Sequence, residues 1–119
     1  MNGVVILVAF AAIKPETMNE WLDRTAMLES RWQDDAIGDK VNRHGKPNPP
    51  HKWSRGRYQI RKPTWEAYSK QPWRTAAHDP VESRRVCVLI LRDCAKACRR
   101  DGKPVTFENV RWYYRHGKF

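Results

Sequence analysis

Apolar side chains recur at helical spacing near the start of the chain. Six residues form or flank one face of the expected helix: Met18, Trp21, Leu22, Thr25, Leu28 and Trp32. Residues three and four apart share a helix face, so this spacing indicates an amphipathic helix. Thr17 and Glu20 have the form of a capping box, in which two side chains satisfy free backbone N–H groups. The pattern predicts a first helix over residues 18–32.

A polar segment rich in glycine and proline follows this helix. Between Asp34 and Arg57 the chain carries three glycines and three prolines among many polar residues, which interrupts regular structure too often for a helix. We therefore expect a long loop. A loop of this length in a compact domain is usually functional or disordered, and the motifs that flank it favour function.

Helix signals return after this loop. Pro63 can open a short helix over residues 63–68, because proline suits the first helical turn. The run Asp79-Pro80-Val81-Glu82 gives a stronger start signal: a capping aspartate, a proline, and a glutamate that can reach back to the helix start. This helix should extend to about Arg100. Its segment 86–91 is apolar on all sides, which is typical of a central buried helix.

A last helix should follow Thr106 and carry four large side chains: Val110, Trp112, Tyr113 and Tyr114. No segment alternates between apolar and polar residues as a half-buried strand does. The sequence therefore predicts a mainly α fold. A length of 119 residues suits a single core, and we assign residues 13–119 to one domain.

Residues 1–12 contain an apolar run that is too short to span a bilayer as a helix. Its length suits the core of a signal peptide, and Ala9-Phe10-Ala11 has the small-x-small form of a cleavage site, although no Lys or Arg precedes the run. Two interpretations stay open: a signal peptide, which would make the protein secreted or periplasmic, and an N-terminal segment that packs on the domain.

The chain is basic, with a formal net charge of +10 and six Trp residues, which describes a folded protein with an anionic partner. Nucleic acid, an anionic membrane surface and the bacterial envelope all meet that condition. Three cysteines share roughly one helical face: Cys87, Cys94 and Cys98. Without a Cys-x-x-Cys pair, and with the histidines scattered through loops, they are expected to be small buried side chains. We expect no metal and no other cofactor.

One charged residue interrupts the apolar face of the first helix. Glu29 completes the series that contains Met18, Leu22 and Thr25, so it should turn inward. Burial disfavours an ionised carboxylate, and the helix C-terminus also disfavours negative charge, so both effects should raise the pKa of Glu29. A carboxylic acid that is protonated near neutral pH can protonate the leaving oxygen of a glycoside. The alternative is an ion pair between Glu29 and an arginine.

Four short motifs follow one another from this helix onward: Glu29-Ser30, Ala36-Ile37-Gly38-Asp39, Gly56-Arg57-Tyr58-Gln59-Ile60 and Pro63-Thr64-Trp65. In this order they resemble the Glu-Ser, Gly-x-x-Gln-Ile and Pro-x-Thr landmarks of soluble lytic transglycosylases and goose-type lysozymes. The resemblance implies a small lysozyme-like helical domain with a long cleft loop. It also implies a muramidase, with Glu29 as general acid on the β-1,4 bond between N-acetylmuramic acid and N-acetylglucosamine of bacterial peptidoglycan.

The resemblance further implies a substrate site in which Ser30, Gly56, Tyr58 and Gln59 lie beside the catalytic acid. Two departures from the family pattern stand out. The segment 40–55 is longer than usual, and the family's later Tyr-Asn-x-Gly element is represented only by residues 112–117, which contain no Asn. Either Tyr113 or Tyr114 would then face the sugar.

The role of Asp39 decides the chemistry. If Asp39 positions water opposite Glu29, the glycosidic bond is hydrolysed. If Asp39 only caps a turn, the substrate's N-acetyl group can assist and an internal alcohol can replace water, which gives the anhydro product of lytic transglycosylation. Trp53, in the loop, is the aromatic residue we favour for stacking on a sugar ring.

Two other classes of function are compatible with parts of the sequence. A nucleic-acid-binding module is suggested by the run Lys52-Trp53-Ser54-Arg55-Gly56-Arg57-Tyr58, in which cations alternate with aromatic rings. Against it, the charge is spread along the whole chain and no helix-turn-helix, zinc-finger or RNP-like pattern occurs. An inactive wall-binding relative ranks last, because the acid is present. We expect a monomer that binds peptidoglycan and the anionic cell envelope, and no nucleic acid.

Overall fold

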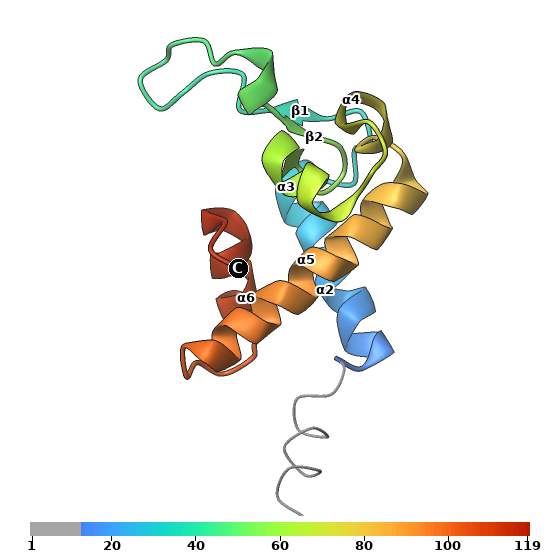
Figure 1. The fold of residues 1–119 in the computed structure, drawn as a ribbon, viewed down its shortest axis with the longest axis vertical. Coiled ribbons are helices and arrows are strands. Elements are labelled where there is room, and N and C mark those ends of the chain that lie inside the picture. The colour runs from blue at the N-terminus through green and yellow to red at the C-terminus, as the bar shows by residue number, and fades with distance from the viewer. Residues whose placement is uncertain (1–12) are drawn as a thin grey trace, which may run out of the picture.

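The structure, a computed structural model, describes residues 13–119, so residues 1–12 and both interpretations of their apolar run lie outside the described residues. Within this range the fold is mainly α, as predicted (Figure 1). The helices are α2 (Pro15–Ser30), α3 (Lys62–Tyr68), α4 (Trp73–Ala76), α5 (Pro80–Arg100) and α6 (Phe107–His116). The strands are β1 (Ile37–Gly38), β2 (Ser54–Arg55) and β3 (Ile60–Arg61).

Helix α5 is the central buried helix, which confirms the prediction from its apolar segment. Its start is capped as expected, because the Asp79 carboxylate accepts hydrogen bonds from the backbone N–H groups of Val81 and Glu82, both at 3.3 Å. Helices α2, α3 and α6 pack against α5, which crosses the middle of the molecule (Figure 1). The three cysteines of α5 are buried, as predicted, and they are free thiols. No helix in the described range is long and apolar enough to cross a membrane.

Helix α2 begins earlier and ends earlier than the sequence pattern indicated. Pro15 occupies its first turn and Lys14 precedes it without a side-chain cap, so the predicted capping box of Thr17 and Glu20 is wrong. The helix ends at Ser30, because Arg31 has a left-handed backbone with φ of 52°. Trp32 therefore lies outside the helix and is partly exposed. The buried face consists of Met18, Trp21, Leu22, Thr25 and Ala26.

A small antiparallel sheet, in the order β1-β2-β3, occupies part of the region expected to be loop. Ile37 pairs with Arg55, and Arg55 pairs with Ile60. Strands of this length contain no alternating pattern that could be recognised in the sequence. The sheet matters for the site because it holds residues 37–39 against residues 54–61, next to the C-terminal end of α2.

Residues 40–53, which we name the arm, extend from β1 and return to β2 (Figure 1). The arm is a loop closed by its own hydrogen bonds. Val41 and Pro47 form an isolated bridge, and the N–H of Asn42 donates to Lys46 O at 2.8 Å. Pro50–Lys52 form one turn of 3-10 helix. The predicted long loop is therefore confirmed for this part of the segment, although it is internally ordered.

A buried carboxylate, Glu82, helps to hold α5 against the end of α3. Its Oε2 accepts a hydrogen bond from Ser69 Oγ at 2.6 Å, and Arg85 donates to Oε1 and Oε2 at 2.7 and 2.8 Å. The side chain is thus directed to Ser69 and Arg85, rather than back to the helix start as the sequence suggested. The hydrogen bonds from Arg85 lower the pKa of Glu82 to about 2.

Replacing Glu82 with Gln should destabilise the protein by about 2 kcal/mol at pH 7, because charge-assisted hydrogen bonds are lost from a buried site. The pKa of Glu82 is depressed on folding, so its contribution is present above pH 4.5 and is lost as the pH falls toward 2. Urea denaturation at several pH values measures the effect, with Glu66→Gln, an exposed residue, as control. Equal stability of Glu82→Gln and the unmodified protein at pH 7 would contradict the prediction.

Candidate active site

A cleft of about 370 Å³ lies between the sheet and the C-terminal turn of α6. Its walls come from the end of α2, Asp39 just before the arm, the segment from β2 to α3, Ile90 of α5, and the chain from Tyr114 to Phe119. Both carboxylates that the sequence singled out, Glu29 and Asp39, line it. Gln59 and Tyr114 also line it, so four of the predicted site residues meet in one cavity.

Glu29 occupies the last turn of α2, and only 19% of its side chain is exposed. Arg111 of α6 donates a hydrogen bond from Nη1 to Glu29 Oε1 at 3.2 Å. Burial raises the pKa of Glu29, while Arg111 and Arg115 lower it and only partly offset the burial. The two alternatives from the sequence are therefore both present: Glu29 is ion-paired, and it still favours the protonated form more than a free glutamate does.

Asp39 lies on the same cleft with 41% of its side chain exposed. Arg61 of β3 holds its carboxylate, with Nη2 at 3.2 Å from Oδ2. The negative charge of Asp39 is one of the effects that raise the pKa of Glu29. The cleft thus combines a half-buried acid with a more exposed, arginine-held carboxylate.

Gln59 presents a rigidly held amide in the cleft wall. Its Nε2 donates to the carbonyl oxygens of Gly56 and Ala36 at 2.9 and 3.2 Å, and its Oε1 accepts from Ser54 Oγ at 2.7 Å. Gly38 packs directly beside it: a Cβ there would lie 2.2 Å from Gln59 Oε1, so a larger residue would displace the amide. Gly38 of the second motif and Gln59 of the third motif therefore pack against each other in one unit.

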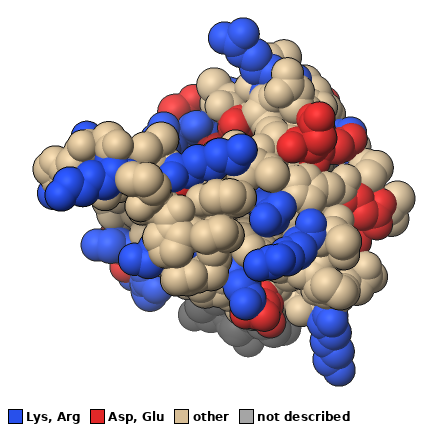
Figure 2. Space-filling model, turned by 90° about the horizontal axis from the view of Figure 1, so that it is seen from above, with Lys and Arg blue, Asp and Glu red and all other residues tan. Residues whose placement is uncertain are grey.

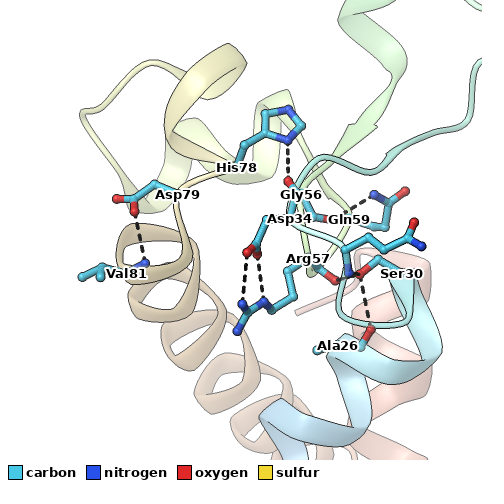
Figure 3. A network of polar contacts seen from close by, with 10 residues as sticks. Ala26, Ser30, Asp34, Gly56, Arg57, Gln59, His78, Asp79 and Val81 are labelled. Carbon is cyan, nitrogen blue, oxygen red and sulfur yellow. Dashed lines mark hydrogen bonds and ion pairs between the residues drawn. The ribbon is translucent and has the colours of Figure 1, made fainter.

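Ser30 fixes the end of α2 to the turn between β2 and β3 and does not line the cleft. Its Oγ donates to Arg57 O at 2.7 Å and accepts from the N–H of Gln33 at 3.1 Å. Arg57 in turn forms a two-pronged ion pair with Asp34, at 2.9 and 3.1 Å (Figure 3). The substrate-binding role predicted for Ser30 is therefore replaced by a structural role beside Glu29.

Asp34, which follows the end of α2, belongs to the same network of contacts. Besides its pair with Arg57, its carbonyl oxygen lies 2.7 Å from His78 Nδ1, which ties the chain after α2 to the segment between α4 and α5 (Figure 3). The sequence did not reveal this network, because its members are far apart along the chain. The one signal in the sequence was Arg57, a charged residue of the Gly56–Ile60 motif to which the sequence analysis gave no role.

Four other predicted substrate-binding residues lie outside the cleft lining. The rings of Tyr58 and Tyr113 are buried in the core, and Gly56 is buried against Ala77. Trp53 is half-buried at the base of the arm, where its Nε1 donates to Asn48 O at 3.0 Å. Substrate contact by the two buried rings is thus corrected to a supporting role.

Tyr114 is the member of the tyrosine pair that faces the cleft. Its hydroxyl donates to Tyr58 O at 2.6 Å, which connects α6 to the GRYQI segment. Burial raises the pKa of Tyr114 well above its ordinary value, so the phenol stays neutral beside Glu29. Tyr113 instead donates its hydroxyl hydrogen bond to Asp101, away from the site.

Backbone strain gathers around these residues. Four residues other than glycine have positive φ in the described range: Arg31, Trp32, Asp39 and Gln59. Each such conformation costs free energy, and strained residues concentrate at functional sites. Two of the four line the cleft, and the other two follow directly on the Glu29-Ser30 pair. The strain therefore marks the same cavity that the carboxylates indicate.

No group of three or more His, Cys, Asp or Glu side chains within residues 13–119 is arranged to hold a metal ion. Searches of protein-family models, curated proteins and solved structures find no match to this chain. A functional assignment consequently rests on the cleft and its side chains.

Proposed function

We propose that this protein cleaves the β-1,4 bond between N-acetylmuramic acid and N-acetylglucosamine in bacterial peptidoglycan. The observation that carries the proposal is the position of Glu29, a half-buried carboxyl with a raised pKa in the wall of an open cleft. Glycoside cleavage needs such an acid, because the leaving sugar oxygen must gain a proton as its bond to carbon breaks. The motif order of the sequence supports the same assignment.

In the proposed reaction, protonated Glu29 transfers its proton to the glycosidic oxygen, and the bond between that oxygen and the anomeric carbon breaks. In lytic transglycosylation, the Glu29 carboxylate that remains accepts a proton from the attacking hydroxyl of the substrate, which restores the acid. In hydrolysis with Asp39 as the base, Asp39 accepts the proton of the attacking water and Glu29 regains its own proton from solvent. Arg111 keeps the carboxyl oriented toward the cleft and stabilises the carboxylate that forms. Asp39, held by Arg61, supplies negative charge near the developing positive charge of the sugar ring.

The nucleophile is water in a lysozyme and an internal hydroxyl of the substrate in a lytic transglycosylase. Mass spectrometry of the products from purified peptidoglycan tests the proposal and separates the two reactions, since the anhydro product is lighter by one water. Intact glycan after prolonged incubation with the purified protein would overturn the proposed function.

Replacing Asp39 with Asn should reduce hydrolysis by about a hundredfold or more if Asp39 activates water, because general base catalysis contributes that range. If the protein is a transglycosylase, the same variant should retain anhydro product formation at a rate close to that of the unmodified protein. Chromatographic separation of the products measures both rates. Asp23→Asn, at an exposed residue outside the cleft lining, serves as control. A hydrolase unaffected by Asp39→Asn would rule out Asp39 as the base.

A further inference from the structure

The arm is an ordered, exposed and strongly basic surface whose role the proposed chemistry leaves open. Its backbone is closed by hydrogen bonds, with the N–H of Asn48 donating to Lys40 O at 2.8 Å. The Asn42 carboxamide oxygen accepts from the N–H groups of His44 and Lys46 at 2.9 and 3.0 Å. Nearly every residue of the arm is exposed, so burial of apolar surface does not explain its order.

The charges of the arm are of one sign. It carries Lys40, Arg43, Lys46 and Lys52, and no Asp or Glu occurs between residues 40 and 65. Basic side chains lie along the arm, which projects to the left in the view from above (Figure 2). Within the described range, no carboxylate forms an ion pair with any of these four cations. Such a surface repels itself and attracts an anionic ligand.

The arm is continuous with the rim of the cleft. Asp39, which lines the cleft, directly precedes it, and Asn48 Nδ2 donates to the backbone oxygen of Asp39 at 2.8 Å. Trp53 anchors the other end through its bond to Asn48, and its ring lies 5.4 Å from Lys40 Nζ. A ligand on the arm would therefore be attached to, or lie directly beside, the polymer that occupies the cleft.

We propose that the arm binds the carboxylate groups of the peptide branches that a peptidoglycan strand carries next to the bond in the cleft. This inference rests on the proposed function. Because the arm is attached at the rim of the cleft, its ligand is more readily a branch of the bound polymer than a separate molecule. All four cations of the arm can pair with carboxylates, and three of them are lysines, which act as single point charges.

The test compares binding to immobilised glycan strands that carry their peptides with binding to the same strands after the peptides are removed. The arm variant carries Lys40→Gln, Arg43→Gln, Lys46→Gln and Lys52→Gln. A matched variant carries the same loss of charge at four exposed sites outside the arm: Lys14, Lys70, Arg92 and Lys96, each changed to Gln. Both variants are compared with a parent protein that keeps all eight cations. All three proteins also carry Glu29→Gln, so that the strands stay intact during the measurement.

The parent protein should bind peptide-bearing strands about tenfold more tightly than bare strands at low salt, and this ratio should shrink as salt rises. The arm variant should lose the ratio, while the matched variant keeps it. Equal ratios in the arm variant and the parent would overturn the inference. So would competition in which polyphosphate or single-stranded DNA displaces the protein from these strands more effectively than polyglutamate of equal charge.

The two proposals fail in different ways. If the unmodified protein cleaves peptidoglycan but the Glu29→Gln parent binds both kinds of strand equally, the inference about the arm is wrong and the proposed function stands. If the unmodified protein releases no product and the parent binds neither kind of strand, both are wrong.

Discussion

Replacement of Glu29 with Gln should reduce turnover on peptidoglycan by at least about a hundredfold, and by up to about ten-thousandfold, while the protein stays folded and still binds glycan. Glutamine has nearly the shape of glutamic acid but no transferable proton. Its amide oxygen can still accept the hydrogen bond that Arg111 Nη1 donates at 3.2 Å. The cleft should therefore keep its form and lose only the acid.

The stability of the Glu29→Gln variant follows from the direction of the pKa shift. Burial raises the pKa of Glu29 above its model-peptide value of 4.5, so its favourable contribution is complete below pH 4.5 and is lost as the pH rises through the folded-state pKa. At neutral pH the neutral amide should cost little, and the melting temperature should stay within a few degrees of that of the unmodified protein.

Melting temperature and turnover should be measured on the same sample. Glu108→Gln is the matched control, because Glu108 also contacts an arginine, Arg24, at 3.5 Å, yet its side chain is exposed and lies outside the cleft lining. A purely structural ion pair makes the opposite forecast for Glu29→Gln, since removal of one partner leaves the guanidinium of Arg111 partly buried and unpaired. A variant that melts early and still cleaves peptidoglycan would end the case for Glu29 as the acid.

The parts of the fold that the sequence predicted well are those fixed by local signals. Asp79 and Pro80 mark the start of α5 because the cap and the first turn involve neighbouring residues. The inward position of Glu29 could be predicted because it follows from helical spacing within one element. The start of α2 was misplaced because Pro15 provides a sufficient start without any side-chain cap, so the capping-box pattern downstream has no structural role.

The missed features depend on contacts between distant parts of the chain. Arg111 reaches Glu29 across 82 positions, and no local pattern distinguishes it from the other arginines of this basic protein. The same limit explains the aromatic residues: composition indicated a surplus of rings, but only packing determines that Tyr114 faces the cleft while Tyr113 is buried. Fold class was thus more predictable than the partners of the acid.

Gly56 is the position where a single methyl group should damage the fold most. Its φ is +83°, and a Cβ there would lie 1.9 Å from the backbone oxygen of Ala77. This contact is with backbone, so relief requires the turn between β2 and β3 to separate from the segment after α4. That movement would disturb Gln59, whose Nε2 donates to Gly56 O at 2.9 Å in the cleft wall.

Gly56→Ala should therefore destabilise the protein by about 3–5 kcal/mol, as the sum of left-handed backbone strain and a steric clash. Gly45→Ala is the matched control, because Gly45 has a similar φ of +76° and open space around the added Cβ. The Gly45→Ala control should lose about 1 kcal/mol of stability, from backbone strain alone. Urea denaturation of both variants isolates the clash as the difference between them. If the two variants lose equal stability, the close contact between Gly56 and Ala77 does not limit this position, and the rigid seating of Gln59 needs another explanation.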